Sequence, residues 1–322
     1  MRKDEKTPLM TYLLRLVRGS RWLLTSVSLL LVLTACVDIP ESTGSAPTKV
    51  AGRSAESLRL EKYYNAVEVR LRQQGLLRTD GGGPDVPFSS RTLVEDFERI
   101  ALYDEYTIRG GRYVAQQTPS YLRRWQQPIR VGLIFGEQVS METRAKDRAN
   151  VIAYSKRLSR LTGVPITVTN TNPNFHILFL YRDEQKTVGP TLLRQVPGLN
   201  PIVIDEIANS PRNTFCVAYA FSNKQNSNAY TSAIILVKAE HSDLMRLSCI
   251  HEEMAQAMGL ANDSPNARPS IFNDDEEFAL LTRHDELLLK MLYDRRLKLG
   301  MTPLTARPLL PSIANDVLGG RS

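Results

Sequence analysis

A short stretch near residue 250 constrains the fold more than any other part of the chain. Read from Glu252, it spells E-E-x-x-Q-x-x-G-L-x-N-D. Residues four apart share one face of a helix, so Glu252 and Gln256 are expected to point the same way. Gly259 suits the helix end, because glycine adopts the left-handed conformation that turns the chain sharply. Asn262 follows the turn and is expected to swing back towards Glu252 and Gln256.

This spacing resembles the zinc site of the metzincin peptidases, H-E-x-x-H-x-x-G-x-x-H, which is followed by a turn that carries Met. The resemblance places Glu252, Gln256 and Asn262 where that family has its three histidines. It places Glu253 at the general base, and Asp263 directly after the last ligand position. The metal-binding frame is therefore present in outline, with its ligands replaced.

The resemblance extends over roughly residues 129–293. Phe272, in Ser-Ile-Phe, takes the place of the turn methionine, and the segment that ends at Tyr293 resembles the closing helix of the matrixins. This implies an α+β fold: a metzincin-like mixed sheet with a backing helix and a site helix, preceded by a small helical layer. The whole pattern, with Gly-Leu-Leu-Arg-Thr-Asp at 75–80, also resembles the bacterial domain-of-unknown-function family 2927. That family name implies no activity.

The first residues are typical of an export signal. Basic residues precede an apolar run at 23–33, which is too short to span a bilayer comfortably. Leu-Thr-Ala-Cys then resembles a lipobox, which implies cleavage before Cys36 and lipid on its sulfur. Val37, rather than Asp, favours the outer membrane under enterobacterial sorting rules. We therefore expect an exported protein, lipid-anchored at the periplasmic face; the alternative is an uncleaved N-terminal anchor helix.

Removal of this signal changes the charge. The precursor has 41 basic and 34 acidic residues, of which six and two lie in residues 1–35, so the mature chain keeps 35 and 32, a net charge of +3. The strong positive charge belongs to the signal, and no basic and aromatic motif follows it. Nucleic-acid binding is therefore not expected.

Composition and hydrophobic period divide the chain into five parts. They are a lipoprotein signal at 1–35, a flexible tether at 36–54, an N-terminal helical region at 55–125, the metzincin-like domain at 126–300 and a C-terminal tail at 301–322. Within the main domain the pattern predicts a helix at 143–161 that ends at Gly163, and strands at 129–135, 166–169, 175–181, 214–221 and 232–238. Residues 183–213 carry turn formers and are predicted to be an insertion over one edge.

Two cysteines remain if Cys36 carries lipid. Cys216 is predicted in a strand and Cys249 in the site helix, in an oxidising compartment. A disulfide between them would pin that helix to the sheet and contribute about 3.5–4 kcal/mol in the chain-entropy model. The alternative is two separate buried cysteines.

The replaced ligands disfavour zinc. Zn²⁺ prefers imidazole and thiolate, whereas the equivalent positions offer one carboxylate and two amides. His251 lies one position off the ligand face, and the residue four positions on is Ala255. We therefore expect no zinc site.

Two other interpretations of the motif stay open. An oxygen shell would suit Ca²⁺ or another hard divalent ion, with donors from Glu252, Glu253, Gln256, Asn262 and Asp263. Alternatively, Glu252, Gln256 and Asn262 form a hydrogen-bond network that holds the helix to the turns at Gly259 and Phe272.

The expected function is non-catalytic: binding a peptide, a peptidoglycan component or a partner protein of the cell envelope. The alternative is a peptidase-like hydrolase that uses Glu253 as general base with a non-zinc metal. A glycosidase-like pair is not expected, because adjacent residues on a helix diverge by about 100°.

Overall fold

The computed structural model describes residues 52–109, 112–222, 228–273 and 275–319. The predicted signal, Cys36 and all but the last three residues of the predicted tether lie outside the described residues. Among the helices that the structure describes, none combines the length and apolar character needed to cross a membrane.

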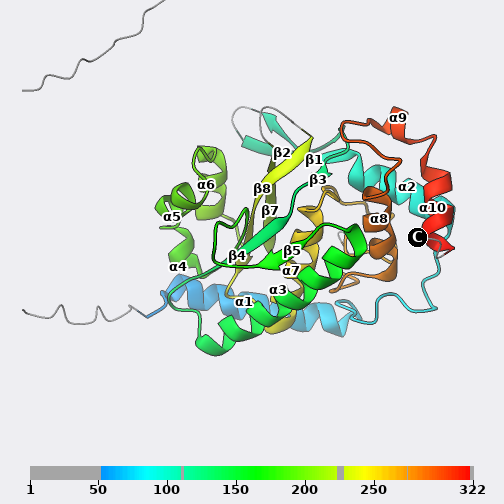
Figure 1. Cartoon of the computed structure of the whole chain (residues 1–322). Helices are drawn as coiled ribbons and strands as arrows, with labels where there is room; N and C mark the ends of the chain where they lie inside the picture. The colour runs from blue at the N-terminus through cyan, green and yellow to red at the C-terminus, as the bar shows by residue number, and fades with distance from the viewer. Residues whose placement is uncertain (1–51, 110–111, 223–227, 274, 320–322) are drawn as a thin grey trace, which may run out of the picture. The chain divides into compact units, whose positions relative to one another are not determined.

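A mixed six-stranded sheet forms the centre of the domain (Figure 1). Its strands are β3 (Arg124–Trp125), β4 (Ile129–Phe135), β5 (Ile166–Val168), β6 (Phe175–Leu180), β7 (Cys216–Ser222) and β8 (Ala229–Lys238). The order runs β5-β4-β6-β8, and β8 pairs with both β3 and β7. Every pairing is parallel except that between β7 and β8. The predicted class, α+β with a mixed sheet, is confirmed at this level.

Both faces of the sheet are buried. All six residues of β6 are buried, and alternate side chains enter two different cores, since successive side chains in a strand point to opposite faces. Ile177 and Phe179 join the larger core, while Leu178 and Leu180 join the smaller one. This burial explains why the strand is apolar at every position except His176.

The core on the first face includes residues of α3 (Met141–Thr162), α7 (Asp243–Gln256) and α8 (Arg283–Leu292). Ser140 caps the N-terminus of α3, and Gly163 ends it with a φ of 73°. This confirms the predicted helix and its glycine stop. The left-handed conformation of Gly163 provides the C-cap.

Residues 183–213 cover the second face rather than an edge. They form three short helices, α4 (Arg182–Gln185), α5 (Gly189–Gln195) and α6 (Pro201–Ala208). Leu192, Val203 and Ile207 pack with Leu178 and Ile234 of the sheet. The prediction of an insertion over one edge is corrected here. Each helix is too short to show a clear period, and its stability comes from the sheet beneath it.

The N-terminal region is not only helical. After α1 (Ala55–Gln73) and α2 (Ser90–Ala101), it forms an antiparallel hairpin of β1 (Tyr103–Arg109) and β2 (Arg112–Pro119), followed by β3. The sequence carried a signal for this hairpin, since Gly-Gly separates two runs that contain Tyr, Thr, Ile and Val.

The predicted C-terminal tail contains two helices, α9 (Pro303–Ala306) and α10 (Leu310–Leu318). Leu310, Ile313 and Ala314 are fully buried in the larger core, and α10 lies against α2 and α8 (Figure 1). The described part of this segment therefore belongs to the folded domain.

Candidate functional site: an acidic cleft along an edge strand

Helix α7, which carries the motif, is fixed at both ends and along its length. The Ser242 side chain caps its N-terminus. The Tyr154 hydroxyl donates to the carbonyl of His251 at 2.8 Å. After the helix, Trp125 Nε1 donates to Ala257 O at 2.8 Å, and the Tyr293 hydroxyl donates to Met258 O at 2.9 Å. The bonds to Ala257 and Met258 satisfy carbonyls that a helix end leaves without an intrahelical partner.

His251 has a structural role in this arrangement. Its Nδ1 accepts a hydrogen bond from the backbone N–H of Leu281 at 3.0 Å, and its ring stacks on Tyr154 with centroids 4.0 Å apart. Burial, with a smaller effect from Arg157, lowers the pKa of His251 to about 3. The neutral ring therefore joins α7 to the segment before α8.

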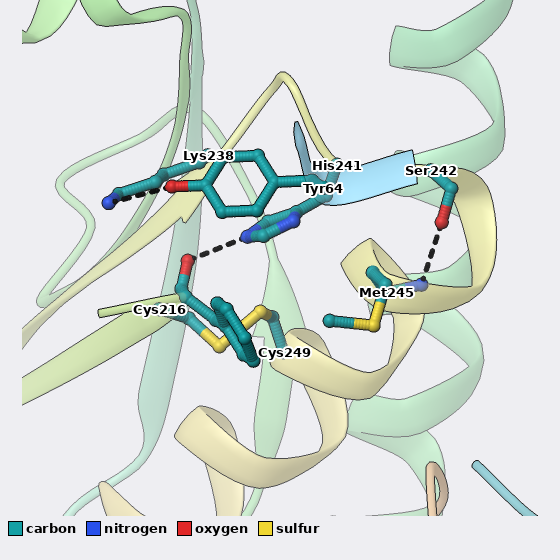
Figure 2. Close-up of a disulfide and its surroundings, with 8 residues drawn as sticks. Tyr64, Cys216, Lys238, His241, Ser242, Met245 and Cys249 are labelled. Atoms are coloured by element: carbon teal, nitrogen blue, oxygen red, sulfur yellow. Dashed lines mark hydrogen bonds between the residues drawn. A yellow bond between two sulfur atoms is a disulfide. The ribbon is translucent and has the colours of Figure 1, made fainter. Parts of the chain in front are cut away.

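A disulfide connects α7 to the sheet (Figure 2). The structure joins Cys216, the first residue of β7, to Cys249 with Cα atoms 5.8 Å apart, as the sequence predicted. Tyr64 of α1 packs over the ring of His241 next to this bond, with centroids 4.2 Å apart. Helix α1 therefore covers the part of the molecule where α7 is tied to β7.

A cleft of about 1340 Å³ includes Cys216 of this disulfide in its lining. Its walls are formed by α6, β7, α7 and the start of the β1–β2 hairpin. The residues that line it are Asp104, Thr118, Arg123, Pro201, Ile202, Asp205, Glu206, Asn209, Ser210, Pro211, Thr214, Cys216, Val217, Ala218, Tyr219, Ala220, Phe221, Tyr230, Glu252, Glu253, Gln256, Ala257, Ala261 and Asp263. Local sequence patterns did not identify α6 as a wall, because its position depends on packing against the distant strand β8.

The lining of this cleft is strongly acidic. Among the described residues, the lining contains the carboxylates of Asp104, Asp205, Glu206, Glu252, Glu253 and Asp263, together with the guanidinium of Arg123. Arg123 itself forms an ion pair with Asp104. A cleft lined by one sign of charge focuses the field and favours ligands of the opposite sign, here cations.

The predicted polar residues divide into two groups. Gln256 Nε2 donates to Asp263 Oδ1 at 3.3 Å in the cleft wall. Asn262 is fully buried against the end of α2, where its Nδ2 donates to Arg99 O at 2.8 Å. Gln117 of β2 joins the groups, since its Nε2 lies 3.0 Å from Asp263 O and 3.5 Å from Asn262 Oδ1. Sequence reasoning missed Gln117, because it lies in a strand that was not predicted.

The two predicted turns take different forms. Phe272 is fully buried, and its carbonyl accepts from the N–H of Ser264 at 2.8 Å, which closes the loop after the motif. Gly259 has the expected positive φ, 122°. A Cβ atom at Gly259 would also lie 2.3 Å from the carbonyl oxygen of Arg123. Two backbone segments therefore meet where only glycine fits.

We expect Gly259→Ala to lower the free energy of unfolding by about 1–3 kcal/mol, through strain at positive φ and the contact with Arg123. Gly163→Ala is the matched control, because Gly163 also has a positive φ but has open space around it. Urea denaturation of both variants checks this. Equal losses would show that the approach to Arg123 has no energetic effect.

Residues 90–312 match the sequence profile of a family described as a protein of unknown function, DUF2927. The chain belongs to this family. The match covers the hairpin, the sheet, the cleft and most of the C-terminal helices. No curated protein matches the chain. The DUF2927 domain therefore has to be interpreted from its own site.

Proposed function

We propose that this DUF2927 protein is a lipid-anchored protein of the cell envelope whose cleft binds an extended, positively charged peptide segment of a partner protein without cleaving it. Export and anchoring rest on the Cys36 motif, and the periplasmic face of the outer membrane is the proposed location. The domain is proposed to be a degenerate metzincin-like module. The order of strand, helix, strands and site helix supports that resemblance.

The observation that carries the binding proposal is the open edge of β7 inside the cleft. Within the described residues, β7 pairs with β8 alone. An exposed strand edge presents N–H and C=O groups that pair with an added strand, the mode by which many domains bind extended peptides. The acidic walls on both sides then select cationic side chains.

The register identifies which backbone groups face the cleft. The N–H of Ala233 in β8 donates towards β6, and the direction of these groups alternates along a strand. Ile234 therefore bonds towards β7, where it lies opposite Tyr219. The N–H and C=O groups of Ala218 and Ala220 consequently point away from β8, towards the cleft.

The residues at the ligand-equivalent positions support a non-catalytic role. The Asn262 side chain is hydrogen-bonded to the end of α2, and the His251 ring is hydrogen-bonded to the backbone before α8. The amide of Gln256 binds zinc poorly. No imidazole stands at these positions to hold a zinc ion with an open coordination site, which zinc catalysis requires.

Ala218→Pro tests strand addition, because proline removes an outward N–H at an edge position where it is tolerated. The probe is an array of extended peptides that differ in net charge, followed by titration of the best binder. We expect a preference for Lys-rich and Arg-rich peptides, weaker binding at high salt, and at least about a tenfold loss of affinity in Ala218→Pro. Ala218→Ser, which keeps the N–H, is the control.

Unchanged affinity in a folded Ala218→Pro variant would contradict strand addition. Equal binding of acidic and basic peptides would contradict the charge selection. Thermal melts of both variants establish that the fold is retained.

Hydrolysis is the second candidate function, favoured by the position of Glu253. This glutamate lines the cleft although it is only 4% exposed, which suits a general base held beside a substrate. Mass spectrometry of the best-binding peptide, incubated with Ca²⁺, Mg²⁺ or Mn²⁺, checks this. Cleavage that is lost in Glu253→Gln would replace the binding proposal with an enzymatic one.

A further inference from the structure

The disulfide lies at the wall of the cleft, directly beside two carboxylates. The Sγ atom of Cys216 and one oxygen each of Glu252 and Glu253 all lie within 4.8 Å of one another. Cys216 lines the cleft and is partly exposed, whereas Cys249 and Glu253 are 2% and 4% exposed. A reductant or an ion can therefore reach this group from the cleft, although most of it is shielded from water.

Two elements bring the donors together. In α7, Glu252 and Glu253 follow Cys249 by three and four residues, so the three side chains lie on neighbouring positions of one helix surface. Strand β7 supplies Cys216 from the opposite side, and the disulfide holds it against α7. Cys216 Sγ therefore lies beside both carboxylates, and Cys249 Sγ is attached to it through the disulfide.

The oxidation state decides what this set can bind. In the disulfide each sulfur is bonded to the other and carries no negative charge, whereas the thiolate is the form that binds metals. Two thiolates and two carboxylates match the ligand types and number of a closed tetrahedral Zn²⁺ site. These donors differ from the ones that the sequence motif placed at the ligand positions.

We propose that reduction of Cys216–Cys249 converts the wall of the cleft into a Zn²⁺ site formed by Cys216, Cys249, Glu252 and Glu253. The reductant is a dithiol. One of its thiolates attacks Cys216 Sγ, which breaks the S–S bond and releases Cys249 as a thiolate. The second thiol then closes the dithiol into a disulfide and releases Cys216. Two electrons pass to the protein, and Zn²⁺ displaces the remaining thiol protons into solvent.

Ion binding at this place would change the cleft. Zn²⁺ would neutralise negative charge at the α7 wall, because Glu252 and Glu253 are two of the acidic residues that line the cleft. The bound ion would also keep α7 tied to β7 after the disulfide is broken. This inference stands independently of the peptide proposal, because it depends only on the donor set.

Zinc binding by the mature full-length protein tests the proposal. The protein is reduced with dithiothreitol, desalted without oxygen and titrated with Zn²⁺ in competition with a chromophoric chelator. Co²⁺ serves as a second probe, since its absorption reports thiolate ligation. We expect one equivalent bound by the reduced protein, none by the oxidised protein, and a loss of Co²⁺–thiolate absorption in Cys216→Ser.

Glu252→Gln, which removes one proposed ligand and leaves both thiols, is expected to weaken Zn²⁺ binding by at least about tenfold. Glu206→Gln is the matched control, because Glu206 lines the same cleft on α6 and accepts from the Tyr219 hydroxyl at 2.8 Å, outside the donor set. Equal weakening in both variants would indicate a general charge effect and overturn the site.

Three other outcomes would also overturn it. They are equal zinc uptake by oxidised and reduced protein, no uptake by a folded reduced protein, and unfolding on reduction as seen by circular dichroism. The last outcome would show that the disulfide is required for the fold, so that no reduced site forms.

Discussion

Replacing Asp285 with alanine is expected to lower the free energy of unfolding by about 3–5 kcal/mol, a large share of the total stability of a typical domain. Asp285, in the first turn of α8, is fully buried. Its carboxylate accepts four hydrogen bonds, at 2.5–3.1 Å, from Ser270, Ile271 and Thr282. Alanine would leave several of these donors buried without an acceptor, and each costs about 1–3 kcal/mol.

These bonds fasten the Phe272 turn to α8, so the same variant should loosen the loop after the motif. Asp316→Ala is the matched control, because Asp316 lies on the neighbouring helix α10 in a partly exposed ion pair with Arg296. Such pairs contribute about 0–1 kcal/mol. Guanidinium denaturation of both variants measures the difference. If Asp285→Ala lowers the free energy of unfolding no more than Asp316→Ala does, the hydrogen bonds of the buried carboxylate do not stabilise the fold.

The second large effect concerns His284, and we expect about 3 kcal/mol of stability to be lost as the pH rises from 6.5 through 9. His284 is fully buried, with Nε2 3.0 Å from Asp96 of α2 and Nδ1 3.6 Å from Asp285. The ring of Phe88 also packs against it, with centroids 5.1 Å apart. Burial alone would lower the pKa of His284, but Asp285 and Asp96 outweigh it and raise the pKa to about 9.

The direction of the pH effect follows from this raised pKa. The folded protein holds the proton more tightly than the unfolded chain, so the stabilisation is fully present below pH 6.5 and disappears above pH 9. Lys238 acts oppositely at higher pH, since burial lowers its pKa to about 8 and folding becomes more favourable as this lysine loses its proton. The comparison between the wild type and His284→Gln isolates the histidine.

Denaturation curves at several pH values between 6 and 9.5 provide the measurement. The difference in stability between the wild type and His284→Gln should shrink across this interval. If this difference in stability stays constant with pH, His284 is neutral in the folded protein. The neighbouring carboxylates would then not stabilise its protonated form.

Local patterns sufficed for the elements that depend on neighbouring residues. The run at 129–135, the helix that ends at Gly163 and the site helix with its positive φ at Gly259 all follow from period and glycine geometry. The Cys216–Cys249 pairing could be anticipated because few cysteines remained. The helices, strand and turn depend on residues that are close in the sequence. The disulfide could be predicted because only two cysteines were left to pair.

Longer-range packing decided the rest of the fold. The short helices at 182–208 and the helix at 310–318 have little hydrophobic period of their own, and they gain their stability from the surfaces they cover. The sequence pattern therefore predicted an edge insertion at 183–213 and a tail at 301–322. The β1–β2 hairpin was missed although Gly-Gly between strand-forming residues indicated it.

By itself, the sequence determined that a helix would present Glu252, Glu253 and Gln256 on adjoining surfaces, that a glycine would turn the chain after it, and that a strand would precede it. Only the tertiary structure decided what these residues face. It turned Asn262 towards α2, placed the α6 carboxylates opposite α7, and left the edge of β7 open between them. The physical reason is that helix and turn geometry depend on residues a few positions apart, whereas a cleft depends on how distant elements pack, which local spacing does not specify.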